Sequence, residues 1–270
     1  MDETLRAAGP PLTRDRGAGT IARGLVLTLA LMTATGCAPT RPIAPPGVIA
    51  PPSEPTIDDR VAQYGPSARA RLLPFFATAG VPYPPSRFLL LGLKQERELQ
   101  LYASGPAQRL TFVRSFAIRG ASGGLGPKLR EGDRQVPEGV YSIVYLNPTS
   151  VAHLALALGY PNEFDRAHAA EDGRESAILG GDIMIHGGSG SIGCLAVGDQ
   201  AAEDLFILAA DSDWASALVV ISPVDFRRTD LPIDQVPATP WAPRLYVWLR
   251  TVLATLPPPP PSERGIAGAR

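Results

Sequence analysis

Eight short apolar runs, each bounded by turn-forming residues, fill much of the chain between residues 87 and 221. They are four to nine residues long and rich in Val, Ile, Leu and Phe, which is typical of β-strands. Glycine and proline separate several of them, and Gly105-Pro106 is expected to form a hairpin turn. The runs occupy residues 87–93, 99–103, 110–118, 139–146, 154–158, 182–185, 194–197 and 218–221. This pattern predicts one mainly β domain, residues 87–230, with peripheral helices.

Apolar residues recur at helical spacing in three other places. Residues 57–86 are predicted to form a helical lead-in, with the helix itself over 57–79. A second helix is expected to begin at Asp199, a good N-cap residue. Residues 231–256 are predicted to contain an amphipathic helix that packs on the domain, and the Pro-rich tail at 257–270 to be disordered.

The first 36 residues are predicted to be a secretory signal. Arg14, Arg16 and Arg23 precede an apolar run at 24–32, and small residues follow directly before Cys37. The run is too short for a stable membrane span, which needs about 20 residues. Cys37 resembles the lipidated cysteine of the bacterial lipoprotein lipobox, which implies an exported, periplasmic protein held on a membrane by its lipid anchor. The alternative is an ordinary signal peptide and a free Cys37.

Residues 37–56 are rich in proline and have no hydrophobic period, so we expect an extended tether. The chain carries 25 basic and 26 acidic side chains, and this balance gives no reason to expect a nucleic-acid partner. Its two cysteines, Cys37 and Cys194, lie in such different contexts that a disulfide is not expected.

The segment with the clearest chemical pattern is DIMIHGGSGSIGCLAVGD, residues 182–199. An apolar run ends at His186, a glycine-rich loop follows, and Cys194 comes eight positions after His186. A thiol becomes a strong nucleophile when a neighbouring imidazole takes its proton, so this pair is a candidate nucleophile and base. The backbone amides of Gly193 and Cys194 are then candidates for an oxyanion hole.

Other interpretations of these residues exist. An isolated cysteine is often a small buried apolar residue, and an isolated histidine is often structural. Zinc requires three or four ligands, and the remaining histidines, His153 and His168, lack ligand spacing to this pair. The match to G-x-G-x-x-G at 188–193 is followed by a predicted strand instead of the helix that a dinucleotide site requires. We therefore predict neither a metal nor a cofactor.

Several motifs in order resemble one enzyme family. They are His186-Gly187 with Ser191-Ile192-Gly193-Cys194, then GPKLREGD at 126–133, QVPEG at 135–139, GYPN at 159–162, and Phe164-Asp165. Together they resemble the L,D-transpeptidase catalytic domain, in the murein transpeptidase branch with a shortened His-to-Cys loop. The resemblance covers roughly residues 87–221.

The resemblance implies a mainly β, sandwich- or barrel-like catalytic domain. It implies that Cys194 is the nucleophile, that His186 donates and accepts the proton, and that the backbone carbonyl of Gly187 orients His186. Most family members have His and then Arg or Asn where this chain has Ile192 and Ala196. The group that binds the substrate carboxylate is therefore expected elsewhere, and the candidates are Lys128, Arg130 and Arg166.

The implied function is peptidoglycan L,D-transpeptidation through a thioester on diaminopimelate-containing stem peptides. One alternative is an amidase that hydrolyses the link between diaminopimelate and a covalently attached outer-membrane protein. A second is a non-catalytic wall-binding lipoprotein. The intact pair of His186 and Cys194 favours an enzyme.

Overall fold

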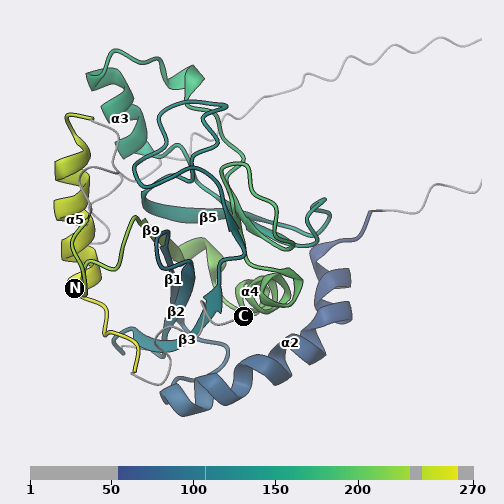
Figure 1. The fold of residues 1–270 in the computed structure, drawn as a ribbon. Helices are drawn as coiled ribbons and strands as arrows, with labels where there is room; N and C mark the ends of the chain where they lie inside the picture. The colour runs from purple at the N-terminus through teal and green to yellow at the C-terminus, as the bar shows by residue number, and fades with distance from the viewer. Residues whose placement is uncertain (1–53, 107, 232–238, 261–270) are drawn as a thin grey trace, which may run out of the picture. The chain divides into compact units, whose positions relative to one another are not determined.

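The computed structural model describes residues 54–106, 108–231 and 239–260 (Figure 1). The predicted signal, Cys37, nearly all of the predicted tether and most of the predicted tail lie outside these ranges.

The described strands form one mixed sheet in the order β3-β2-β1-β9-β5-β6-β7-β8-β4. The pairs β1–β9 and β7–β8 are parallel and the other neighbours are antiparallel. The predicted mainly β class is thus confirmed, and β4 is a two-residue strand that the sequence pattern did not predict. The strands are β1 (Arg87–Leu93), β2 (Glu98–Ser104), β3 (Thr111–Ala117), β4 (Gly120–Ala121), β5 (Gly139–Asn147), β6 (Ala155–Leu158), β7 (Met184–His186), β8 (Leu195–Ala196) and β9 (Leu218–Ser222).

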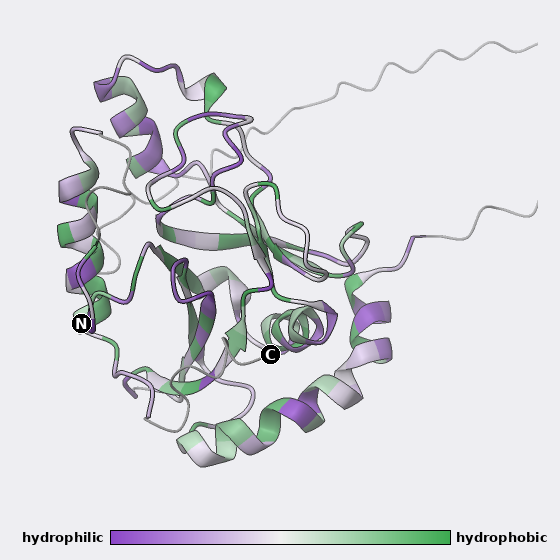
Figure 2. Ribbon diagram, viewed as in Figure 1, coloured by the Kyte–Doolittle hydropathy of each residue, from purple (hydrophilic) through white to green (hydrophobic). Residues whose placement is uncertain are grey.

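Apolar side chains cover both faces of the central strands. Leu90 of β1 belongs to the core that the sheet forms with α2 (Ile57–Ala79) and α4 (Asp199–Asp211). Its neighbours Leu89 and Leu91 belong to a second core with α5 (Ala242–Ala254). Alternate residues of a strand point to opposite faces, so a strand between two layers of helices is apolar throughout. Figure 2 shows hydrophilic and hydrophobic segments alternating along α2, as expected for a helix with one face on a core.

Capping residues fix where the helices begin. Thr56 and Asp59 form a capping box at the start of α2, and Asn162 and Asp165 do the same for α3 (Glu163–Glu171). The sequence pattern did not predict α3. The helix predicted from Asp199 begins there, but its N-cap is Gly198, and the Asp199 carboxylate accepts a hydrogen bond from Gly188 N instead. Short 3-10 turns lie at Ser176–Ile178 and Trp214–Ser216.

Ring stacking and polar contacts attach α3 to α5. The His168 ring stacks on Trp241 with centroids 4.9 Å apart and an interplanar angle of 6°. The Trp241 indole N–H donates to Asp172 Oδ2 at 2.7 Å, and Arg244 pairs with Glu171 at 2.6 Å. The predicted packing of the C-terminal helix on the domain is therefore present. No helix in the described ranges is both long enough and apolar enough to cross a membrane.

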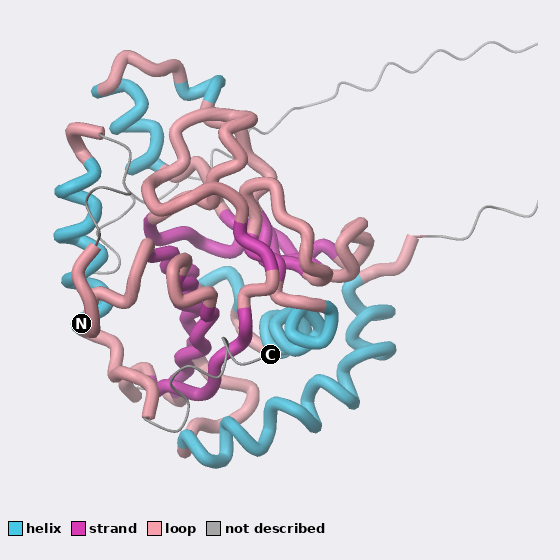
Figure 3. Tube along the Cα trace, viewed as in Figure 1, coloured by secondary structure: helices cyan, strands magenta, loops and turns pink. Residues whose placement is uncertain are grey.

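A buried ion pair positions the long loop before β5. Lys94 Nζ donates to Glu138 Oε1 at 2.9 Å and to the carbonyls of Gly126 and Val136, both at 3.0 Å. The Tyr246 hydroxyl of α5 donates to Glu138 Oε2 at 3.0 Å. Burial lowers the pKa of Lys94, and the Glu138 carboxylate opposes this by favouring the charged ammonium. Residues 126–138 are thus fastened to β1 and α5, and Figure 3 shows how much of the region beside α3 consists of such loops.

Candidate active site

The parallel pairing of β7 and β8 relates His186 to Cys194. His186 ends β7 opposite Ala196, and Ile185 lies opposite Leu195 in the core. Cys194 directly precedes β8, in a bend, so this pairing brings the backbone at Cys194 beside the end of β7. The short β7–β8 pair is thus what places the two candidate residues in one region of the fold.

His186 is held by the carbonyl of its neighbour. Its Nδ1 lies 2.7 Å from Gly187 O, and the imidazole is largely buried. A carbonyl oxygen only accepts hydrogen bonds, so Nδ1 carries the proton and Nε2 is left as the basic nitrogen. The Gly187 carbonyl, which was predicted to orient His186, is therefore within hydrogen-bonding distance of its imidazole.

Gly187 occupies a position with no room for a side chain. A Cβ there would lie 2.6 Å from Asp199 Oδ1 and 2.7 Å from Ala152 O. The same Asp199 oxygen accepts the N–H of Gly188 at 2.7 Å, and Gly198 N donates to Gly188 O at 2.9 Å. The start of the glycine-rich loop is thus tied to the first residue of α4, a role for Asp199 that the sequence analysis did not find.

The Cys194 thiol lies against the chain that leads into β7. Its Sγ is 3.5 Å from Asp182 O. Partial burial raises the pKa of Cys194, the Met184 backbone N–H opposes this, and the charges of Asp182 and Lys128 raise and lower the pKa respectively. The net shift is upward, so the resting group is a neutral thiol at neutral pH and requires a base for activation.

Two serines connect the residues around Cys194 to the chain after β4. Gly193 N donates to Ser122 Oγ at 2.6 Å, and Ser122 Oγ donates to Arg134 O at 2.7 Å. Ser191 Oγ donates to Cys194 O at 2.7 Å and accepts from Ser122 N at 3.1 Å. The Gly193 amide, predicted to bind an oxyanion, is therefore already occupied, and it must exchange Ser122 for a substrate oxygen to fill that role.

The three candidate cations for the substrate carboxylate lie in different environments. Lys128 is buried, and its ammonium donates to Asp133 Oδ1 at 2.7 Å and to Arg130 O at 2.8 Å. Its ammonium is therefore held by its own loop in this structure, and that it binds the substrate carboxylate stays a prediction. Arg130 is exposed. Arg166, also exposed, lies on α3 and lines a groove.

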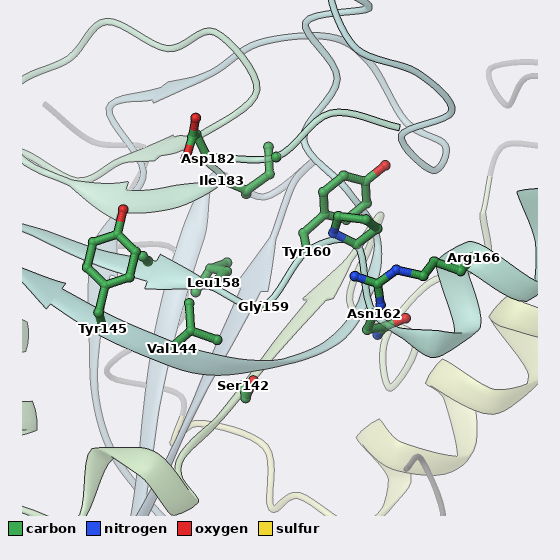
Figure 4. Close-up of a pocket in the computed structure, with 13 residues that line it drawn as sticks. Ser142, Val144, Tyr145, Leu158, Gly159, Tyr160, Asn162, Arg166, Asp182 and Ile183 are labelled. Atoms are coloured by element: carbon green, nitrogen blue, oxygen red, sulfur yellow. The ribbon is translucent and has the colours of Figure 1, made fainter. Parts of the chain in front are cut away.

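This groove has a volume of about 550 Å³ and lies between β5, β6, the start of α3 and residues 181–183 (Figure 4). Asp182 and Ile183 line it, and Asp182 is also the residue whose carbonyl contacts the Cys194 thiol. A Cβ on Gly193 would lie 3.5 Å from Ile183 Cδ1. Cys194 does not line the groove itself, and Asp182 and Ile183 separate the groove from the thiol. In the described ranges no group of three or more His, Cys, Asp or Glu residues could hold a metal ion.

Comparison with known proteins agrees with the motif pattern. Residues 98–221 match the family model of the L,D-transpeptidase catalytic domain, YkuD. The chain is 38% identical over 140 residues to a protein of Escherichia coli K12 named "Putative L,D-transpeptidase YafK". The match covers 51% of this chain and 53% of that protein, so this chain spans about half the length of the curated relative.

Two solved structures match this chain over about half of each chain's length. The helical cell shape determining protein Pgp2 of Campylobacter jejuni is 23% identical with a TM-score of 0.39, covering 51% of this chain and 48% of that one. Bd1075 of Bdellovibrio bacteriovorus is 22% identical with a TM-score of 0.37, covering 53% and 50%. By the family match and the 38% identity, residues 98–221 are similar to the L,D-transpeptidase catalytic domain family.

Proposed function

We propose that this domain is a cysteine acyltransferase that acts on peptidoglycan stem peptides, with Cys194 as nucleophile and His186 as its base. The observation that supports the proposal is the β7–β8 register, which brings the backbone at Cys194 beside the end of the strand that carries His186. The Nδ1 bond to Gly187 O adds to it, because it leaves Nε2 as the nitrogen that can accept a proton.

The proposed reaction has two halves. His186 Nε2 takes the thiol proton, and the Cys194 thiolate attacks the carbonyl carbon of an amide at the L-centre of diaminopimelate. The C–N bond breaks as His186 returns the proton to the leaving amine, which gives a thioester. An acceptor amine then attacks the thioester and passes its proton to His186, the new amide forms, and the thiol is restored. No cofactor enters this scheme.

Hydrolysis is the second candidate outcome, with water in place of the acceptor amine. The loop from Gly187 to Gly193 supplies none of the groove residues. It packs toward β4, where a Cβ on Gly120 would meet the Ser189 carbonyl, and the Ile192 side chain is 77% exposed. A loop turned away from the groove favours access for water and for a bulky protein-linked substrate.

The test of the proposal is mass spectrometry of the products that the full chain forms from diaminopimelate-containing muropeptides. Cys194→Ala and Cys194→Ser should both lose turnover, because alanine has no nucleophile and serine is a weaker one for this base. Their thermal midpoints should stay near that of the wild type, since the thiol is small and only partly buried. Retained turnover in both variants would exclude the thioester. Binding to peptidoglycan without turnover by the wild type would favour the non-catalytic wall-binding alternative.

A second measurement separates transfer from hydrolysis. The ratio of released peptide to cross-linked dimer should be followed over a range of acceptor concentrations. We expect released peptide to dominate at low acceptor concentration. Dimer alone under those conditions would mean that water does not reach the thioester. For the amidase alternative, the substrate to test is a stem peptide that is still attached to an outer-membrane protein.

A further inference from the structure

The groove beside Cys194 has an exposed charged side chain at each end. Of the described residues that line it, Arg166 and Asp182 are the charged ones, and both are exposed. Neither side chain forms an ion pair or a hydrogen bond with another described residue. By contrast, Arg69, Arg71, Arg174, Arg227, Arg244 and Arg250 are all paired with carboxylates.

The two charges lie on opposite sides of the groove. Figure 4 shows Ile183 and Tyr160 between Asp182 and the guanidinium of Arg166. This separation explains why the two do not pair with each other. Between them the floor is partly apolar, because Val144 and Tyr145 of β5 are 48% and 44% exposed there and Leu158 of β6 adjoins them. A ligand that satisfies this groove has an anionic end, an aliphatic middle and a cationic end.

The backbone fixes each charge at its end. Asp182 has a φ of 55°, a left-handed conformation that Asp and Asn tolerate better than other side chains, and this turn brings its carbonyl to Cys194 Sγ. Arg166 lies in the first turn of α3, which the Asn162–Asp165 capping box holds and the contacts to α5 support. The cationic end of the ligand therefore lies next to the nucleophile.

We propose that this groove is the subsite that orients the donor stem peptide, with Asp182 binding an ammonium close to the scissile carbonyl and Arg166 binding a carboxylate at the remote end. The inference rests on the proposed function and extends it to substrate selection. The diaminopimelate side chain supplies the ammonium. The side-chain carboxylate of diaminopimelate is on the same carbon as that ammonium and cannot reach the other end of the groove at the same time, so the carboxylate that Arg166 binds is that of the preceding D-glutamate.

The subsite also has a consequence for activation. The Asp182 carboxylate is one of the charges that raise the pKa of Cys194. An ammonium bound at Asp182 offsets that charge, so a correctly charged substrate makes the thiol easier to deprotonate. Peptides without the ammonium bind without this effect.

The experiment compares four peptides with the full chain and its Arg166→Gln and Asp182→Asn variants. The peptides are the diaminopimelate stem peptide, its form acetylated on the side-chain amine, its form amidated on D-glutamate, and a form with lysine, which lacks the side-chain carboxylate. We expect the wild type to lose at least about 10-fold in kcat/KM for the acetylated peptide and for the peptide amidated on D-glutamate. The lysine peptide keeps the side-chain ammonium and the D-glutamate carboxylate and should lose little. Arg166→Gln should remove only the carboxylate preference, and Asp182→Asn only the ammonium preference.

Two controls make the result decisive. Arg109→Gln removes an exposed arginine that does not line the groove and should leave every preference unchanged. Calorimetric binding of the same peptides to the Cys194→Ala protein reports on the subsite even if no peptide is turned over, so failure of the proposed function is separable from failure of the subsite. Equal affinity for all four peptides, or preferences that survive both groove variants, would overturn the inference.

Discussion

The amide of Gly193 donates to the hydroxyl oxygen of Ser122 at 2.6 Å, across 71 positions of sequence. Gly193 directly precedes the candidate nucleophile, and Ser122 directly follows β4. Because the Ser122 hydroxyl also donates to Arg134 O at 2.7 Å, a single side chain joins the Cys194 turn to the loop that carries Lys128. The conformation of the turn therefore depends on a contact distant in sequence.

Replacing Ser122 tests this contact. Ser122→Ala removes the hydroxyl that Gly193 N and Arg134 O share, and we expect the free energy of unfolding to fall by about 1–2 kcal/mol. Turnover should fall several-fold because the turn around Cys194 loosens. Chemical denaturation and steady-state kinetics measure the two effects. Ser189→Ala, on an exposed residue of the same loop, is the matched control and should change neither. A rise in kcat would instead mean that Ser122 competes with the substrate oxygen for the Gly193 amide.

The reactivity of Cys194 should depend on pH in a defined direction. Burial raises the pKa of its thiol, so the apparent pKa for alkylation should lie above that of an ordinary cysteine. Asp182→Asn should lower this pKa by removing a nearby negative charge, and Lys128→Met should raise it by removing a positive one. Iodoacetamide labelling over a pH series, measured on the Cys194 peptide by mass spectrometry, gives the values. An apparent pKa below the ordinary range would identify a resting thiolate–imidazolium pair.

The stability of α3 should depend on the protonation of Asp165. Burial raises the pKa of this carboxyl group to about 7 in the folded protein, from 3.8 when exposed. Between these values the folded state holds a proton that the unfolded state has released, so the free energy of unfolding falls as pH rises from 4 to 7. This loss of stability is complete above the pKa that Asp165 has in the folded protein, and it amounts to at most about 4 kcal/mol.

Asp165→Asn isolates this contribution, because Asn still offers an oxygen to the Asn162 amide. The difference in unfolding free energy between variant and wild type should grow in favour of the variant from pH 5 to pH 8. Urea denaturation at both pH values measures it. A difference that stays constant would mean that Asp165 does not titrate in this window.

The membrane anchor is a prediction about residues outside the described ranges. In its native host the full chain should fractionate with membranes and incorporate labelled fatty acid at Cys37. Cys37→Ala should abolish labelling and leave an unprocessed precursor or a released protein. A wild-type protein that is unlabelled and free in the periplasm would point to an ordinary signal peptide.

The pattern of apolar residues along the chain predicted most helices and strands, but it did not predict β4 and α3. β1 and α2 have the predicted bounds, because a long run of strand-forming or helix-spaced apolar residues is a strong local signal. β4 is Gly120–Ala121, which lacks the branched and aromatic side chains that marked the other strands, and α3 has nine residues, a short run for helical periodicity. The Asn162-x-x-Asp165 pattern was the available signal for α3.

The sequence by itself determined the mainly β class, and it indicated the family and a candidate pair of a histidine and a cysteine separated by a glycine-rich loop, since these depend on residue types at fixed spacing. Tertiary structure alone decided which charged residues surround that pair. Lys128 and Arg166 are both cations in family-like motifs, yet one is buried against Asp133 and the other opens onto the groove with Asp182. The physical reason is that burial and ion pairing depend on segments distant in sequence, and the same distant packing brings Ser122 to Gly193 and Asp199 to Gly188.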